Sequence, residues 1–286
     1  MSTPVLTTAR APLTRSVQVV NEHGETETIS IPAERSLTVY VDKRELVTLM
    51  TLGAHPEWLV LGYLRNQRLV ETAAAVESVT VDWEVSSAAV KTRAGIDRIE
   101  ERTSRRVVTT GCGQGSVFGG LMDEVESLRL PEGAITQAQL YGIVNTIRLK
   151  ESTYKSAGSV HGCALFRGQE MLLFVEDVGR HNAIDTIAGW MWLHAQDARL
   201  AVTVDQPLVF YTTGRLTSEM VIKSAQMGVA IVISRSGMTQ MGHEIAGRVG
   251  LCTVGRATGR HFVCYTAPER LVLQPELAGQ RLRSAS

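Results

Sequence analysis

The sequence predicts an α/β fold, in which a layered βαβ domain follows a smaller N-terminal part that is β-rich and of the α+β class. Three observations support this prediction. From about residue 133 to 267, short β-branched apolar runs alternate with segments of helical periodicity, which is typical of a largely parallel sheet with crossover helices. Earlier in the chain, β-branched runs separated by turn residues dominate. The 286 residues, 44% of them hydrophobic, are enough for a substantial core.

The N-terminal part is assigned to residues 16–132, and we expect the polar, Thr-rich lead-in at 1–15 to be disordered. Its first strand patterns predict a meander and cover residues 16–22, 26–32, 37–42 and 43–51. A helix is predicted over 55–71, because Pro56 suits a first helical turn and the leucines lie mainly on one side. Two strand patterns, 76–85 and 88–94, and a helical pattern at 117–128 follow.

The α/β domain is assigned to residues 133–272 and is followed by a tail at 273–286. It opens with a loop and a helix that ends near Lys150. Predicted strands then cover 170–176, 207–213, 229–234, 251–255 and 261–266. Predicted helices cover 181–195, 217–228 and 239–250.

Charge and apolar content exclude several classes of partner. Lys plus Arg number 29 and Asp plus Glu number 29, so no net field attracts nucleic acid or an anionic membrane. The longest apolar stretch, 183–195, is too short for a transmembrane helix, and the N-terminus lacks the apolar core of a signal peptide. We therefore expect a cytoplasmic protein without a disulfide framework. We expect inert core positions for the apolar-flanked cysteines Cys163, Cys252 and Cys264.

Cys112 differs from the other cysteines because it stands in the glycine-rich stretch GCGQGSVFGG at 111–120. Such a stretch cannot pack around a thiol, but it lets the sulfur move between partners. Cys112 lies just ahead of the helix predicted at 117–128, and Arg105 and Arg106 precede it, so a thiolate can be stabilised there. Cys112 is thus a candidate nucleophile or carrier, and a surface cysteine without a role is the alternative.

Glycine and arginine recur in the loops that follow the predicted strands. Ligands of open α/β sheets bind at the carboxyl ends of the strands, where these loops lie. Backbone N–H groups together with guanidinium groups favour an anion such as a phosphate. The alternative for any single loop is a glycine turn beside an exposed arginine. No loop fits a Walker or GxGxxG motif. The residues in question are Asp177, Gly179, Arg180 and His181; Gly214 and Arg215; Arg235; and Arg256, Thr258, Gly259, Arg260 and His261.

His161 and His181 invite a metal or general-base interpretation, although a hydrogen-bonded structural role explains each equally well. The zinc deaminase pattern of HxE with a later PCxxC is absent, because Gly162 and Cys163 follow His161 and the chain has no CxxC. We therefore expect no metal site. A thiol hydrolase that pairs Cys112 with either histidine stays open.

The stretches TGCGQG (110–115), SAGSVHGCALF (156–166), EDVGRHNAIDTIAGW (176–190) and GRLTSEMVIKSAQMGVAIVIS (214–234) resemble the formate dehydrogenase accessory sulfurtransferase family, the FdhD family. The resemblance covers about residues 30–272. It implies a fold similar to cytidine deaminases without their zinc. It also implies a sulfur carrier that takes persulfide sulfur from a cysteine desulfurase and passes it to the molybdenum of bis-molybdopterin guanine dinucleotide for the formate dehydrogenase apoenzyme.

Carried over by position, the resemblance makes Cys112 the sulfur acceptor. It assigns cofactor binding to Arg256, Ala257, Thr258, Gly259, Arg260 and His261, and further candidates for cofactor binding are His161, Gly179, Arg180, His181 and Arg215. GDP is the expected mimic of the cofactor, and whether two chains form a homodimer stays open.

The sequence departs from the family pattern in two places. Some members carry CxxC in the loop, whereas Gly115 stands here in place of the second cysteine, which puts a resolving disulfide partner in doubt. Arg256 replaces the usual aromatic opening of the binding segment. The alternative function is a chaperone that holds the guanine dinucleotide cofactor and delivers it to the apo-dehydrogenase, with Cys112 incidental.

Overall fold

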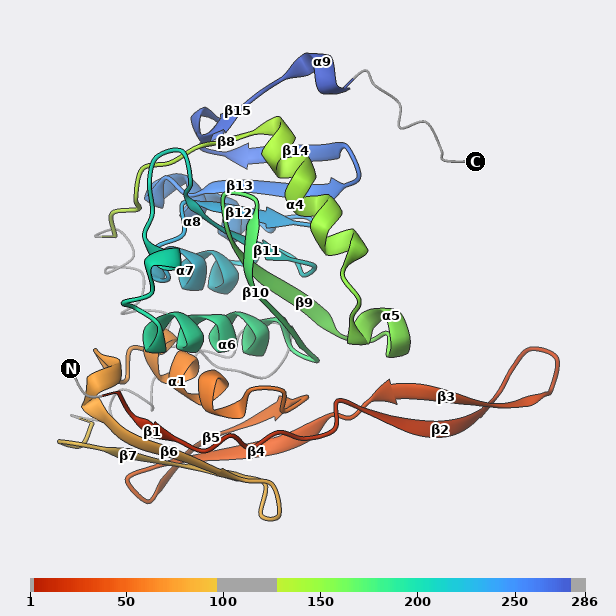
Figure 1. Ribbon diagram of the computed structural model, residues 1–286, viewed down its shortest axis with the longest axis vertical. Helices are drawn as coiled ribbons and strands as arrows, with labels where there is room; N and C mark the ends of the chain where they lie inside the picture. The colour runs from red at the N-terminus through yellow and green to blue at the C-terminus, as the bar shows by residue number, and fades with distance from the viewer. Residues whose placement is uncertain (1–2, 97–127, 279–286) are drawn as a thin grey trace. The chain divides into compact units, whose positions relative to one another are not determined.

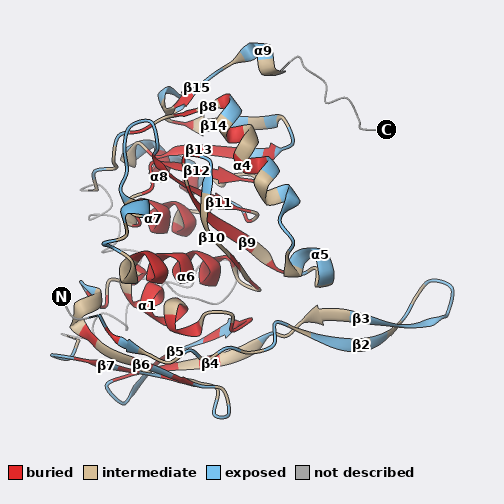
Figure 2. Ribbon diagram, in the orientation of Figure 1, coloured by how far each residue is buried: buried red, intermediate tan, exposed pale blue. Residues whose placement is uncertain are grey.

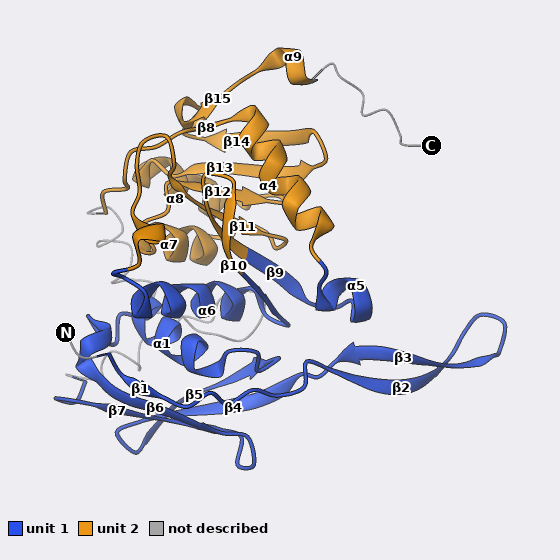
Figure 3. Ribbon diagram, viewed as in Figure 1, with its two compact units in different colours: residues 1–124, 151–163, 174–196 blue, residues 125–150, 164–173, 197–286 orange. Residues whose placement is uncertain are grey.

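The computed structural model describes residues 3–96 and 128–278, which form a mixed α/β structure with several sheets (Figure 1). Two compact units are interleaved along the chain (Figure 3). Unit 1 comprises residues 1–124, 151–163 and 174–196, and unit 2 comprises 125–150, 164–173 and 197–286. This division differs from a single boundary near residue 132, because helix α6 (Arg180–Leu193) packs along helix α1 (Pro56–Asn66) and so belongs to unit 1.

The main sheet of unit 1 has five strands in the order β1-β6-β7-β4-β5. Alternation decides which face is buried, because Leu37, Val39 and Val41 in β4 point into the core while their neighbours are partly exposed. The predicted helix at 55–71 is confirmed as α1, and the predicted strands at 37–42, 43–51, 76–85 and 88–94 are confirmed as four strands of this sheet, whereas β1 was not predicted. The strands are β1 (Val5–Leu6), β4 (Arg35–Val41), β5 (Arg44–Thr51), β6 (Val76–Asp82) and β7 (Ser87–Thr92).

The lead-in is ordered from residue 3, so the prediction of disorder over 1–15 is wrong for the residues that the structure describes. Val5 and Leu6 pair in parallel with β6. The buried carboxylate of Glu57 accepts hydrogen bonds from Thr7 Oγ1 at 2.6 Å and from the Ala9 backbone N–H at 2.8 Å. These partners are distant in sequence, and they hold a segment whose own composition favours disorder.

The first strands do not form one continuous meander. Strands β2 (Thr14–Val20) and β3 (Thr26–Pro32) form a separate two-stranded antiparallel sheet. The reason is that both edges of β4 are occupied, by β5 on one side and by β7 on the other. A strand with two paired edges has no backbone groups left for β3.

Helices α1 and α6 pack against each other in unit 1, and most of their residues are buried (Figure 2). Every residue of α6 from Arg180 to Met191 is buried. The two helices approach closely where Gly62 and Gly189 face each other's backbone, with a Cβ at Gly189 placed 2.8 Å from the Gly62 nitrogen. Asn66 Nδ2 donates to Asp185 Oδ1 at 2.7 Å within this interface. The contact therefore depends on the absence of side chains at two positions.

The six-stranded sheet has the order β10-β9-β11-β12-β13-β14. Strands β11, β12 and β13 pair in parallel, and helices α7 and α8 connect them, as predicted. Strand β14 pairs antiparallel to β13. The relation to cytidine deaminases stays a prediction. The elements are β9 (His161–Arg167), β10 (Glu170–Asp177), β11 (Leu208–Thr212), α7 (Ser218–Gln226), β12 (Ile231–Ser234), α8 (Gln240–Val249), β13 (Cys252–Thr258) and β14 (His261–Thr266).

Shorter elements complete the described chain. Helix α4 begins with a capping box in which Thr136 and Gln139 satisfy each other's backbone N–H groups, as the loop-then-helix prediction near residue 133 requires. No helix within residues 3–96 and 128–278 is long and apolar enough to span a membrane. The elements are β8 (Ile135–Thr136), α4 (Gln137–Leu149), α5 (Thr153–Ala157), β15 (Leu271–Val272), α9 (Pro275–Ala278), and the 3-10 turns η1 (Ala73–Ala75), η2 (Ala198–Leu200) and η3 (Pro268–Arg270).

Candidate functional site

Cys112, the predicted sulfur acceptor, lies outside the described residues, as do Gly115 and residues 117–127 of the predicted helix at 117–128. The described residues do include the predicted anion-binding loops. We name their meeting place in unit 2 the carboxyl-edge site. It comprises the loop 213–217 after β11, the loop 235–239 after β12, and Gly255 and Arg256 in β13.

Hydrogen bonds lock the first two loops of the carboxyl-edge site together. The Leu216 backbone N–H donates to the Gly237 carbonyl at 3.0 Å, and the Leu216 carbonyl accepts from the Thr239 N–H at 3.1 Å. Below them, the buried Ser234 hydroxyl donates to the Gly214 carbonyl at 2.7 Å. The buried backbone groups thus have partners, and both loops are fixed before any ligand arrives.

Strand β13 joins the same edge through Arg256. Its backbone N–H donates to the Ser236 carbonyl at 2.8 Å, and its φ of 52° places a non-glycine residue in the left-handed region. Gly255 permits this approach, because a Cβ there would lie 2.9 Å from the Ser236 carbonyl oxygen and 2.6 Å from the Tyr265 ring. Arg256 lies within β13, where the register with β14 shifts, and a left-handed backbone is uncommon for a residue other than glycine.

The carboxyl-edge site gathers positive charge and helix N-termini. Arg215, Arg235 and Arg256 come from its three segments and are exposed. Helix α7 begins at the edge, where the buried Thr217 Oγ1 has no hydrogen-bond partner among the described residues. Helix α8 begins there too, and Thr239 caps it. Guanidinium groups beside two helix N-termini suit an anion such as a phosphate.

The rest of the predicted binding segment is less uniform. Thr258, Gly259 and His261 are exposed at the β13–β14 turn, whereas Ala257 is buried. Arg260 has structural partners: its Nη1 donates to the Leu277 carbonyl at 2.9 Å, and its guanidinium lies 5.9 Å from the centroid of the Tyr141 ring. The prediction treats Arg256 and Arg260 alike, but in the structure Arg256 is the one that points its charge to solvent at the edge.

The loop after β10 belongs to unit 1 and is organised by Asp177. The Asp177 carboxylate accepts from Thr51 Oγ1 at 2.5 Å, from the Leu52 N–H at 3.1 Å, from the Gly179 N–H at 3.0 Å and from Asn182 Nδ2 at 2.9 Å. Burial raises the pKa of this carboxyl, while its hydrogen bonds act in the opposite direction. Asp177 therefore anchors the start of α6 to the end of β5.

The predicted residues of this loop are placed by the same anchor. Gly179 is the N-cap of α6, and Arg180 and His181 occupy its first turn with 4% of each side chain exposed. His161 begins β9 and is half-buried. The structure thus buries Arg180 and His181 at the start of α6, whereas Arg215 and Arg256 are exposed.

Asp177→Asn is expected to lower the free energy of unfolding by about 2 kcal/mol, because an amide NH₂ would face donors that now point at a carboxylate oxygen. Urea denaturation followed by circular dichroism measures the effect. Asp205→Asn is the matched control, since Asp205 is exposed, and its stability should stay within about 0.5 kcal/mol of wild type. Equal stability of the two variants would contradict the anchoring role.

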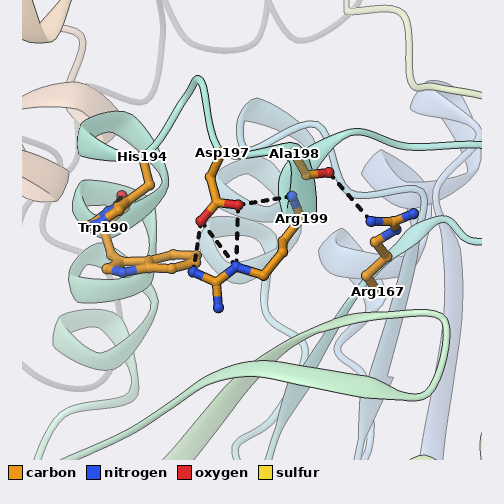
Figure 4. A network of polar contacts seen from close by, with 6 residues as sticks. All are labelled: Arg167, Trp190, His194, Asp197, Ala198 and Arg199. Carbon is orange, nitrogen blue, oxygen red and sulfur yellow. Dashed lines mark hydrogen bonds and ion pairs between the residues drawn. The ribbon is translucent and has the colours of Figure 1, made fainter.

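A second group of charges lies on the surface around η2 (Figure 4). Arg199 Nη2 and Nε contact Asp197 Oδ2 at 2.7 and 3.0 Å, and this pairing raises the Arg199 pKa. Arg167 Nη1 donates to the Ala198 carbonyl at 3.3 Å. Because Arg199 is already held by a carboxylate, this surface differs from the carboxyl-edge site and is less suited to an anion.

The described residues offer no metal centre. Within residues 3–96 and 128–278, no group of three or more His, Cys, Asp or Glu side chains lies close enough to hold a metal ion. Sequence reasoning named the arginines of the carboxyl-edge site but missed Gly255 and Ser234. A glycine directly before Arg256 at a strand end was the available signal for the first.

Comparison with known proteins agrees with this architecture. The family model described as the FdhD/NarQ family matches residues 32–272. The chain is 27% identical over 260 residues to the sulfur carrier protein FdhD of Geobacillus kaustophilus, covering 91% of this chain and 94% of that one. It is 28% identical over 257 residues to the protein of the same name from Bacillus subtilis, covering 87% and 94%.

A solved structure shares the fold. The chain superimposes with a TM-score of 0.71 on a crystal structure assigned as a formate dehydrogenase accessory protein from Desulfotalea psychrophila. Sequence identity is 22%, and the match covers 91% of this chain and 100% of that one. At this identity the likeness concerns the fold alone.

Proposed function

This chain belongs to the FdhD/NarQ family, and on that premise we propose that it is a sulfur carrier for the maturation of formate dehydrogenase. It accepts persulfide sulfur from a cysteine desulfurase on Cys112. It then delivers that sulfur to the molybdenum of bis-molybdopterin guanine dinucleotide, which is its substrate. The names of the relatives support the carrier function, and the glycine-rich surroundings of Cys112 support the choice of residue.

The loading step conserves the oxidation state of the transferred sulfur. The Cys112 thiolate attacks the outer sulfur of the desulfurase persulfide, the S–S bond of that persulfide breaks, and the desulfurase cysteine leaves as a thiolate. Cys112 then carries the sulfur as its own persulfide. Release of that sulfur as sulfide requires two electrons, which an external thiol reductant supplies because Gly115 replaces the second loop cysteine.

The carboxyl-edge site is the observation that supports a guanine dinucleotide substrate. Its three exposed arginines and two helix N-termini suit the pyrophosphate groups of that molecule. Thr217 Oγ1, at the start of α7, is buried and has no hydrogen-bond partner among the described residues. Arg256 adds a guanidinium that the chain retains despite a left-handed backbone.

Arg256→Gly separates ligand binding from stability. Glycine relieves the left-handed strain, so the variant should be as stable as wild type or more stable by up to about 1 kcal/mol. It removes one of three guanidinium groups, so the increase in thermal midpoint caused by GDP should shrink strongly. Thermal unfolding with and without millimolar GDP measures both effects.

Arg199→Gln is the matched control, because Arg199 is an exposed arginine of the same unit that lies outside the carboxyl-edge site. It should keep the full response to GDP. A wild-type midpoint that does not respond to GDP, or an Arg256→Gly variant that responds as strongly as wild type, would contradict guanine nucleotide binding at this edge.

A further inference from the structure

Two cysteines outside the proposed sulfur-carrying loop lie on neighbouring, paired strands of unit 2. Cys252 begins β13, Cys264 lies in β14, and Cys264 is the cross-strand partner of Val254. Since Cys252 precedes Val254 by two residues, its side chain lies on the same face of the sheet as that of Cys264. The two thiols are therefore diagonal neighbours across the paired strands, and each shifts the pKa of the other.

The two thiols differ in their access to solvent. Cys252 is fully buried, whereas Cys264 is partly exposed. Cys264 Sγ also lies 3.5 Å from the Thr266 carbonyl oxygen. A dissolved reagent therefore reaches Cys264 first, and Cys252 only through it.

The contact also makes the two thiols unequal as acids. Hydrogen bonding to Cys252 lowers the pKa of Cys264 to about 7, against the opposing effects of burial and the Glu269 carboxylate. The same contact, together with burial, raises the pKa of Cys252, and the nearby Arg270 only partly offsets it. A thiolate therefore forms on Cys264 near neutral pH, on the side that solvent reaches.

We propose that Cys252 and Cys264 form a redox-active dithiol that a small-molecule disulfide oxidises, with Cys264 as the attacking thiolate. The Cys264 thiolate attacks one sulfur of the small disulfide, whose S–S bond breaks and releases one thiolate. Cys252 then loses its proton and attacks the Cys264 sulfur of the mixed disulfide, releasing the second thiolate. The two cysteines lose two electrons, and the small disulfide gains them.

This dithiol is independent of the proposed function. It involves neither Cys112 nor the arginines of the carboxyl-edge site. Thiols of the kind that reduce other intracellular disulfides reopen the bond, so it is a reversible modification and not a structural crosslink.

The test uses full-length wild-type protein and oxidised glutathione. After incubation at pH 8, free thiols are blocked with iodoacetamide and the protein is digested with trypsin. Cys252 and Cys264 fall in the separate peptides 249–256 and 261–270. We expect these two peptides to be recovered joined by a disulfide. Recovery of both peptides singly, from protein whose circular dichroism shows it folded, overturns the proposal, as does a crosslink from either cysteine to Cys112 or Cys163.

Variants of the pair test the order of the two steps. Cys252→Ala should stop at glutathione attached to Cys264, and Cys264→Ala should leave Cys252 unmodified. The pH profile of iodoacetamide reaction at Cys264 should be half-maximal near pH 7 in wild type. It should move toward about 8.5, the pKa of an ordinary cysteine, in Cys252→Ala. Identical pH profiles in the two proteins would overturn the assignment of Cys264 as the activated thiol.

Discussion

Gly189→Ala is expected to destabilise unit 1 by about 3 kcal/mol or more, or to prevent its folding. A Cβ at Gly189 would overlap the Trp58 carbonyl oxygen and lie 2.8 Å from the Gly62 nitrogen. These obstacles are backbone atoms of α1, so no side-chain rotation can make room. The helices would have to move apart, and the contacts of the fully buried Ile184 and Ile187 in α6 would be disrupted.

Urea denaturation of the purified protein measures this effect, and solubility on expression reports it if the variant does not fold. Gly247→Ala is the matched control, because Gly247 lies in α8 and a Cβ there would meet no described atom within 4 Å. Alanine there should stabilise the protein by up to about 1 kcal/mol through helix propensity. If Gly189→Ala unfolds within about 0.5 kcal/mol of wild type, the close helix crossing is wrong.

Cys112→Ala is expected to abolish formate dehydrogenase maturation, with activity in a strain that lacks this protein falling on the order of a hundredfold or more below the wild-type complement. Removing the thiol removes the only atom that the proposed relay uses to hold sulfur. Formate dehydrogenase activity of the complemented strains is the measurement, with the amount of each variant compared by immunoblot.

Two further variants make this experiment specific. Cys163→Ala removes a buried cysteine of β9 and should retain activity. Arg256→Gly should lose activity whether the protein carries sulfur or only the cofactor. A chaperone that merely delivers cofactor should tolerate Cys112→Ala and still fail with Arg256→Gly, so that pattern would favour the alternative function.

Most helices and strands are predictable because the residues of a single segment determine whether that segment is a helix or a strand. Pro56 and the apolar side of α1, and the continuous apolar runs of β11 and β12, are signals within single segments. Local patterns could not predict that the segment around β1 is ordered. It is held by pairing with β6 and by hydrogen bonds to the Glu57 carboxylate, which is 48 and 50 residues from its partners Ala9 and Thr7.

The candidate site was predictable in its location but not in its detail. The rule that ligands bind at the carboxyl ends of parallel strands indicates the loops after β11 and β12, and hydrogen bonds at Leu216 and Ser234 join these loops. The left-handed backbone of Arg256 follows from a register shift between β13 and β14 that depends on both strands. The contact of Arg260 with the Leu277 carbonyl likewise depends on a distant segment.

The cysteines show the same limit. Apolar neighbours predict core positions for Cys252 and Cys264. Cys252 is buried, but the prediction is wrong for Cys264, which is partly exposed. The pairing of β13 with β14 makes the two thiols diagonal neighbours, and no feature of either segment alone indicates that proximity.

The central claim, that Cys112 carries sulfur, is tested most directly by intact-protein mass spectrometry after incubation with a cysteine desulfurase and cysteine. The wild-type protein should gain the mass of one sulfur atom, and dithiothreitol should remove it. Cys112→Ala should gain none, while Cys163→Ala should gain as much as wild type. Full sulfur loading of Cys112→Ala, or no loading of the wild-type protein by a desulfurase that is active on cysteine, would contradict the account.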